Sequence, residues 1–228
     1  MRPLPAGLIV SCQAEAGSPF CAPEFIVAFA RAAELGGAVG LRLCGVENVA
    51  AVRAVTSLPI IGLTKHRYPD GEVLITAGLA EARALAAAGA DVIALDATHR
   101  RRPSGDDALR LLGQVREVTG RPVLADIATL AEGLAAHAAD WIGTTLSGYT
   151  PETKGHGEEP DFALVGALAR ELPGKVVAEG RIWSPEQVRR MFELGAHAVV
   201  VGTAITRPTE ITRRFAAACA RGPRSAAH

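Results

Sequence analysis

Three stretches, "ELGGAVGLRL" (34–43), "AAGADVIALD" (87–96) and "ELGAHAVVVG" (193–202), share one pattern that decides the fold. Each starts at the end of a helical segment, passes a glycine able to end a helix, and enters a short apolar run. A repeated transition of this kind is typical of a chain built from alternating helices and strands. The apolar runs of all three stretches are expected to occupy equivalent places in one sheet.

The same alternation continues along the whole chain. Amphipathic segments such as 105–120 and 184–195 carry apolar residues at helical spacing, and Ser184 before Pro185 is typical of a helix start. The apolar runs between such segments are 7–12, 38–43, 59–64, 91–96, 122–127, 140–145, 175–180 and 197–202. Continuous apolar strands alternating with helices indicate a parallel sheet covered on both faces, and this number of units predicts a (β/α)8 TIM barrel of the α/β class. An open doubly wound sheet is disfavoured because no G-x-G-x-x-G motif follows the first run.

Length and composition predict one domain. The chain has 228 residues, 49% of them hydrophobic, and no linker or low-complexity tract divides it. We therefore expect a single barrel over 1–228, with its core at about 7–220 and a flexible tail at 221–228. The alanine-rich terminal segment 211–222 is expected to form a helix that packs on its own barrel or on a partner's, and we predict a homodimer.

Charge and cysteine usage exclude several classes of partner. Lys plus Arg and Asp plus Glu both number 24, so neither nucleic acid nor an anionic membrane is an expected partner. No segment reaches membrane-spanning length and the first apolar run is too short for a signal sequence, so we expect a cytoplasmic protein. The four cysteines form no C-x-x-C pair, which argues against a zinc site and a disulfide framework. Neither a metal nor a cofactor is predicted.

The carboxyl ends of the predicted strands carry many polar side chains. Barrel active sites lie at this end of the strands, so these side chains are expected to surround one site. The seventh strand-like run, "KVVAEG" (175–180), shows the signal most clearly, because Glu179 ends an otherwise apolar strand, where a carboxylate needs either solvent or a partner. The strand-end set is Gln13, Arg42, Lys65, Asp96, Asp126, Thr144, Thr145 and Glu179.

Glycine-containing turns after the last two strands predict a phosphate site. Backbone N–H groups in such turns, with the start of a following helix, can hold a phosphate dianion. The predicted phosphate-binding residues are Gly180, Arg181, Gly202 and Thr203, with Arg207 reaching back towards them. From the residues alone, the chain is a phosphate-binding barrel.

Six longer motifs give a more specific resemblance. "GLIVSCQA", "GLRLCGVENV", "LDATHRRRP", "GTTLSGYT", "AEGRIWSPEQ" and "VVGTAITRPTEIT" resemble the N-acetylmannosamine-6-phosphate 2-epimerase family of sialic acid catabolism, also called NanE, over about residues 7–215. The resemblance implies a metal-independent isomerase that interconverts N-acetylmannosamine 6-phosphate and N-acetylglucosamine 6-phosphate, the activity of an N-acylglucosamine-6-phosphate 2-epimerase (EC 5.1.3.9). It also implies that Lys65 and Glu179 are the catalytic pair. The residues that it implies for holding the sugar and its phosphate are Gln13, Arg42, Asp126 and Arg207.

The chemistry of such a reaction suits these residue types. Inversion at a carbon beside a carbonyl needs groups that remove and return a proton, and donors that stabilise the enolate between those steps. Lys65 and Glu179 are acid/base candidates, Arg42 suits the enolate charge, and Asp126 suits a sugar hydroxyl or an arginine. For Lys65 to act as a base near neutral pH, its pKa must fall by roughly 3 units, which desolvation beside Arg42 would favour.

Alternatives remain open from the sequence. A two-base route uses Glu179 and Lys65 on opposite faces of the substrate, whereas a single-base route uses Lys65 alone. Lys65 could instead form a Schiff base in an aldolase or lyase. A sugar-phosphate-binding protein without catalysis is the third possibility.

Overall fold

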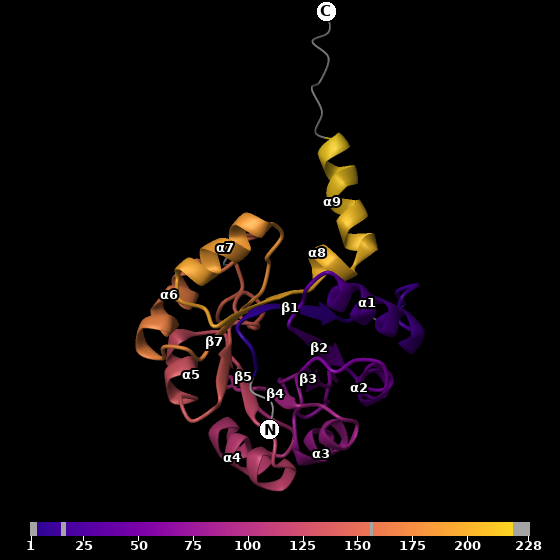
Figure 1. Ribbon diagram of the computed structural model, residues 1–228. Helices are drawn as coiled ribbons and strands as arrows, with labels where there is room; N and C mark the ends of the chain where they lie inside the picture. The colour runs from indigo at the N-terminus through magenta and orange to yellow at the C-terminus, as the bar shows by residue number, and fades with distance from the viewer. Residues whose placement is uncertain (1–3, 15–16, 156, 221–228) are drawn as a thin grey trace, which may run out of the picture.

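In the computed structural model, the chain forms a closed barrel of parallel strands surrounded by helices (Figure 1). The structure describes residues 4–14, 17–155 and 157–220. The predicted barrel is confirmed, because the strands follow one another around the ring in sequence order and β1 pairs with β8 to close it. The segment 221–228, predicted to be a tail, lies outside the described residues.

Each strand falls within, or one residue beyond, an apolar run predicted from the sequence. The strands are β1 (Gly7–Cys12), β2 (Gly40–Cys44), β3 (Ile60–Leu63), β4 (Val92–Asp96), β5 (Val123–Asp126), β6 (Trp141–Gly143), β7 (Val176–Glu179) and β8 (Ala198–Val201). The helices are α1 (Pro23–Leu35), α2 (Val46–Arg53), α3 (Leu79–Ala87), α4 (Ala108–Thr119), α5 (Leu130–Ala135), α6 (Phe162–Glu171), α7 (Pro185–Glu193), α8 (Thr203–Thr206) and α9 (Pro208–Ala220).

The helix starts follow ordinary capping chemistry. The Ser184 side chain accepts a hydrogen bond from the Gln187 backbone N–H, and Gln187 Oε1 accepts one from the Ser184 backbone N–H, as in a capping box. Thr129 and Glu132 cap α5 in the same way. Pro185 occupies the first turn of α7, where its missing N–H costs no hydrogen bond.

Alternating side chains divide the barrel core into two layers. Leu41 and Leu43 of β2 pack outward against the helices, whereas Ile61 and Leu63 of β3 pack into the barrel interior. Because side chains alternate along a strand, Arg42 must point inward between Leu41 and Leu43. The same alternation turns Asp126 and Glu179, the last residues of β5 and β7, into the barrel at its carboxyl end.

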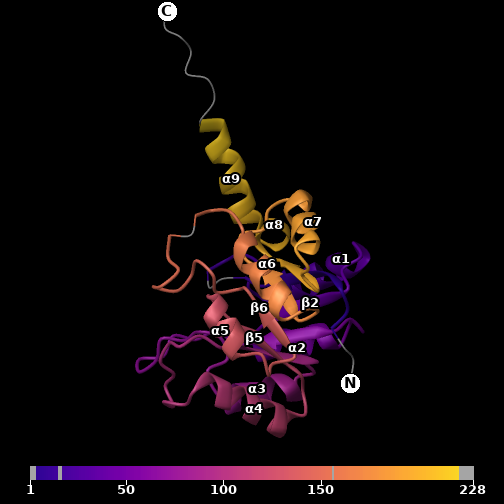
Figure 2. The same ribbon diagram turned by 90° about the vertical axis from the view of Figure 1, so that its left-hand side faces the viewer.

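The last helix leaves the barrel. Helix α9 extends away from the ring of strands and helices, as both ribbon views show (Figures 1 and 2). Its residues 212–219 are exposed, and the Phe215 side chain is 71% exposed. The helix therefore buries little of its own surface against this chain.

Candidate active site

A cavity of about 600 Å³ opens at the carboxyl ends of the strands. It is lined by residues from β1, β7 and β8 and from the loops after β3, β6, β7 and β8. Most of the predicted site residues share this lining: Gln13, Lys65, Glu179, Gly180, Arg181, Gly202, Thr203 and Arg207. The fold thus brings together groups as far apart in the sequence as Gln13 and Arg207, because each lies at or beyond the carboxyl end of a strand of the same ring.

Lys65 follows β3 and is held from two sides. Its backbone forms an isolated antiparallel bridge with Ile75, and its Nζ donates a hydrogen bond to Gln13 Oε1 at 2.8 Å. Gln13 Nε2 in turn donates to Ser11 Oγ at 2.9 Å, which fixes the orientation of the amide. The Lys65 nitrogen therefore has a defined place at the edge of the cavity.

The surroundings of Lys65 favour its neutral form. Desolvation of the ammonium lowers the pKa of Lys65, and the positive charges of Arg42 and Arg207 lower it further. The Cys44 thiol and Glu179 act in the opposite direction without reversing the shift. A lowered pKa is what a lysine needs in order to act as a base near neutral pH, as predicted for Lys65.

Glu179 and Asp126 share one buried arginine. Arg42 Nη2 lies 2.7 Å from Asp126 Oδ2, and Arg42 Nε lies 3.1 Å from Glu179 Oε2. The Arg42 and Asp126 side chains are 1% and 0% exposed, and that of Glu179 is 16% exposed. Burial raises the pKa of Glu179, and Asp126 adds to this, while Arg42 and Lys65 oppose it. Glu179 is thus the member of the cluster that reaches the cavity.

Thr145 connects the two carboxyl groups. Its Oγ1 lies 2.6 Å from Asp126 Oδ1 and 3.2 Å from Glu179 Oε2. A hydroxyl carries one proton, so it donates to one carboxylate at a time. The shorter distance favours donation to Asp126, and the hydrogen bond that Thr145 donates to Glu179 is the weaker of the two.

Arg42 and Asp126 lie beneath the cavity rather than on its wall. Neither belongs to the lining, and both oxygens of Asp126 already accept hydrogen bonds, from Arg42 and Thr145. Of the two partners expected for Asp126, a sugar hydroxyl or an arginine, the structure has the arginine. A direct contact of Arg42 or Asp126 with substrate stays a prediction.

The turns after β7 and β8 bring backbone to the cavity. Gly180 has φ +120°, a conformation that glycine adopts without strain, and Gly202 precedes the short helix α8. The Arg181 guanidinium binds elsewhere: its Nε donates to Glu159 O at 2.8 Å and its Nη1 to Ser147 O. Arg181 can therefore offer the cavity its backbone, while its side chain holds the loop after β6.

Some lining residues were not singled out for the site from the sequence. Tyr149 and Leu146 come from the loop after β6, whose path cannot be read from periodicity. Trp183, from the loop after β7, also lines the cavity, and the Arg214 guanidinium lies 4.5 Å from the centre of its ring. Thr145, by contrast, was predicted among the strand-end residues, and it does line the cavity.

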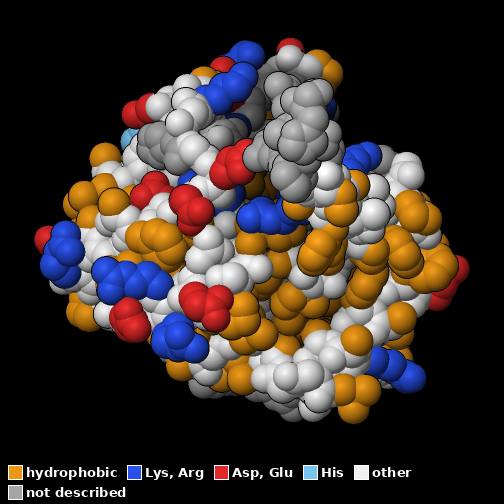
Figure 3. Space-filling model, turned by 90° about the horizontal axis from the view of Figure 1, so that it is seen from above, with side chains coloured by type: hydrophobic (Ala, Val, Ile, Leu, Met, Phe, Trp, Pro, Cys, Tyr) orange, Lys and Arg blue, Asp and Glu red, His pale blue; other side chains and the backbone are white. Residues whose placement is uncertain are grey.

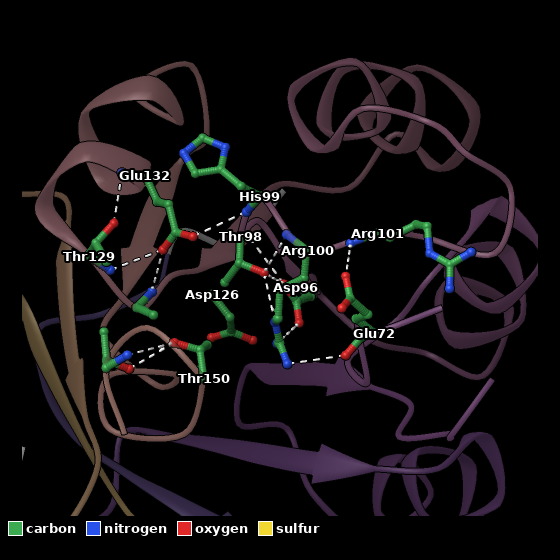
Figure 4. Close-up of polar contacts among 12 residues, drawn as sticks. Glu72, Asp96, Thr98, His99, Arg100, Arg101, Asp126, Thr129, Glu132 and Thr150 are labelled. Carbon is green, nitrogen blue, oxygen red and sulfur yellow. Dashed lines mark hydrogen bonds and ion pairs between the residues drawn. The ribbon is translucent and has the colours of Figure 1, made fainter. Parts of the chain in front are cut away.

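Asp96 belongs to a different cluster. Its Oδ1 accepts from the backbone and side chain of Thr98, and its Oδ2 accepts from Arg100 Nη2 at 2.5 Å (Figure 4). Asp96 does not line the catalytic cavity. The expectation that every polar strand end would meet at one site is therefore wrong for Asp96.

The surface offers no single-sign charge patch on the face viewed from above. Lys and Arg side chains lie among Asp and Glu side chains there (Figure 3). Within the described part of the chain, no set of three or more His, Cys, Asp and Glu side chains is placed to hold a metal ion. In the same residues, every helix is too short or too polar to span a membrane.

Fold and site together define the class of protein. A (β/α)8 barrel with two ionisable side chains facing one cavity, and glycine turns after β7 and β8, has the arrangement of a barrel enzyme that moves protons on a small anionic substrate. The chain belongs to the NanE family: the family model described as "Putative N-acetylmannosamine-6-phosphate epimerase" matches residues 26–221.

Individual relatives match over nearly their whole length. A protein of Caldanaerobacter subterraneus subsp. tengcongensis named "Putative N-acetylmannosamine-6-phosphate 2-epimerase" is 46% identical over 221 residues, which cover 94% of this chain and 92% of that protein. A Synechococcus elongatus protein of the same name is 49% identical over 90% of each chain. The solved structure of the N-acetylmannosamine-6-phosphate 2-epimerase from Clostridium perfringens matches with a TM-score of 0.88 at 41% identity, over 92% of each chain.

Proposed function

We propose that this chain is an isomerase that epimerises C2 of N-acetylmannosamine 6-phosphate to give N-acetylglucosamine 6-phosphate, in the breakdown of sialic acid and other amino sugars. Family membership over most of the chain supports the substrate. The observation that carries the chemistry is the pairing of Lys65 and Glu179 around one cavity. β3 and β7 lie opposite each other in the ring, so the two side chains approach the space between them from opposite sides.

In the two-base route, the Glu179 carboxylate removes the C2 proton of the open-chain sugar. The electron pair of the C–H bond moves towards C1, and the carbonyl oxygen takes up the negative charge of the enolate. The Lys65 ammonium then donates a proton to the other face of C2, and the configuration is inverted. Atoms and charge balance, with Glu179 left protonated and Lys65 left neutral.

The buried cluster supports the role of Glu179. Arg42 and Thr145 hold its carboxyl group in place, because Arg42 Nε and Thr145 Oγ1 both lie within 3.2 Å of Oε2. Burial raises its pKa, which makes the carboxylate a stronger base than an exposed one. Arg42 would then act on catalysis through Glu179, in addition to any contact with the enolate.

The phosphate of the substrate is proposed to bind at the turns after β7 and β8. Gly180, Arg181, Gly202 and Thr203 would offer mainly backbone N–H groups, and Arg207 a positive charge. Gln13, held between Lys65 and Ser11, would contact the sugar near the reacting carbon. The proposal uses neither metal nor cofactor.

Deuterium incorporation in early single-direction turnover tests the route. In deuterated water, a two-base enzyme should place deuterium at C2 of the product and almost none in recovered substrate. Glu179→Gln should abolish turnover and leave substrate binding largely intact. If that variant keeps substantial activity, Lys65 is the only base and Glu179 positions a hydroxyl group. Borohydride with substrate should leave the enzyme unlabelled, since labelling would indicate a Schiff base at Lys65.

We also propose that α9 joins two copies of the chain in a homodimer. Phe215 and the three alanines that follow it are exposed, so the same chain leaves apolar surface of this helix uncovered. A second copy brings the same helix and can bury both faces at once.

A further inference from the structure

The loop between β4 and α4 holds a buried arginine that the catalytic cavity does not use. Arg102 is 2% exposed. Its Nε, Nη1 and Nη2 make no hydrogen bond to any residue that the structure describes. A buried guanidinium without acceptors is costly, and such a group in a native fold needs a partner to explain it.

The loop does not depend on Arg102 for its shape. Asp96 accepts hydrogen bonds from Thr98 and Arg100, and the His99 backbone N–H donates to Glu132 Oε1 at 3.1 Å (Figure 4). Glu132 is itself 3% exposed and is tied to the start of α5. These contacts hold residues 96–100 in place and leave the Arg102 donors unused.

A second cavity, of about 210 Å³, lies over this loop. Arg100, Arg101 and Arg102 line it, together with Asp106 and Asp107, and it shares no lining residue with the catalytic cavity. Asp107 is already engaged, since its Oδ1 accepts from Leu109 N and Arg110 N at the start of α4. The Asp96, Asp106 and Asp107 carboxylates all lie close enough to act on the Arg102 charge, yet none accepts a hydrogen bond from it. Asp96 and Asp107 already accept hydrogen bonds from other residues, which leaves Asp106 as the competing carboxylate.

We propose that this second cavity binds a small oxyanion on Arg102. A guanidinium presents its donors in a planar fork that matches phosphate or carboxylate oxygens, and an anion there would satisfy nitrogens that otherwise have no acceptor. The shared chemistry is a phosphoryl or carboxylate group on a small molecule. The site is distinct from the phosphate-binding turns after β7 and β8.

An anion bound at this site should stabilise the loop after β3, which carries Lys65. Glu72 N donates to Arg101 O at 2.7 Å, Arg101 N donates to Glu72 Oε2 at 3.0 Å, and Arg100 Nη1 donates to Glu72 O at 3.1 Å. A bound anion that holds residues 100–102 would therefore slow hydrogen exchange at the Glu72 amide.

Phosphate titration of the full chain tests the proposal, in an Arg207→Ala background that weakens the catalytic phosphate site. Thermal shift should show saturable stabilisation by inorganic phosphate, and adding Arg102→Gln should weaken the apparent affinity at least about tenfold. Acetate at the same ionic strength separates a carboxylate preference from a phosphate preference. An equal phosphate response with and without Arg102→Gln would overturn the proposal.

Asp106→Asn keeps the test decisive if Arg102→Gln does not fold. Removing the competing carboxylate should tighten phosphate binding and strengthen the protection of the Glu72 amide. If Asp106→Asn instead destabilises the protein and leaves phosphate affinity unchanged, Asp106 is the partner of Arg102 and the anion site does not exist.

Discussion

Replacing Arg42 by methionine tests the buried charge cluster beneath the catalytic cavity. Methionine keeps an unbranched apolar stem like that of arginine and removes the charged guanidinium with its donors. The Asp126 carboxylate, 0% exposed, and Glu179, 16% exposed, would then lack their shared cation. Removing one partner of a buried ion pair costs about 3–5 kcal/mol of unfolding free energy, because the remaining charge is left uncompensated. We expect Arg42→Met to lower the unfolding free energy by an amount in this range at pH 7.

The same variant should be less impaired at low pH. Arg42 opposes the rise in the pKa of Glu179, so its removal raises that pKa further above the unfolded value of about 4.3. Between the two pKa values the folded variant binds more protons than the unfolded chain, and its stability therefore rises as the pH falls. The loss of unfolding free energy should therefore be smaller at pH 5 than at pH 7.

Equilibrium urea denaturation at both pH values measures this effect. Arg190→Met is the matched control, since Arg190 pairs with Glu193 and both side chains are more than half exposed. An exposed pair of this kind contributes at most about 1 kcal/mol. A loss below about 1 kcal/mol for Arg42→Met, or a loss equal at the two pH values, would refute the reasoning.

Three further predictions concern the substrate, the proton and the assembly. Arg207→Ala should raise KM for the 6-phosphate with little change in kcat, and N-acetylmannosamine without phosphate should lose several kcal/mol of transition-state binding, measured as kcat/KM. Thr145→Val removes a hydrogen bond that lowers the pKa of Glu179, so the acid limb of kcat/KM should move to higher pH; an unmoved limb would contradict the assignment. Phe215→Glu should convert a dimer to a monomer by light scattering, and a wild-type monomer at micromolar concentration would contradict the dimer.

The fold could be predicted because each apolar run is bounded by its own turn chemistry. The glycines of the three repeated stretches mark where helices end. The ends of every predicted apolar run lie within two residues of the ends of the observed strand. The buried parallel strands are apolar on both faces, so their number could be counted without knowing which face each residue covers.

The layer of the barrel that each inward-facing site residue occupies was harder to predict. Arg42 and Glu179 both point into the barrel by alternation, yet Arg42 lies two residues before the end of β2 and Glu179 ends β7. That difference places Arg42 in the layer beneath the cavity and Glu179 in its wall. The sequence specifies which residues face inward, whereas the layer they occupy depends on the stagger between neighbouring strands.

The position of the Arg102 cavity depends on loop geometry that periodicity does not encode. The composition of "LDATHRRRP" indicates a basic loop in solvent. Arg101 is exposed, whereas Arg100 is partly buried. Arg102 is buried, and the three residues before it are held by contacts with Asp96, Glu72 and Glu132. Contacts between residues so far apart in the sequence become visible only in three dimensions.

The opposite pKa shifts of Lys65 and Glu179 bear on the choice between two bases and one. With ordinary pKa values of about 10.4 and 4.3, moving a proton from Lys65 to Glu179 would cost about 8 kcal/mol. After each forward turnover, a two-base enzyme is left with neutral Lys65 and protonated Glu179. It therefore needs a small difference between the pKa values of these two groups. The structure lowers the pKa of Lys65 and raises that of Glu179, which narrows the gap from both sides. A single-base enzyme does not use Glu179 as an acid or a base, so it gains nothing from the raised pKa of Glu179. The buried cluster that raises this pKa therefore favours the two-base route.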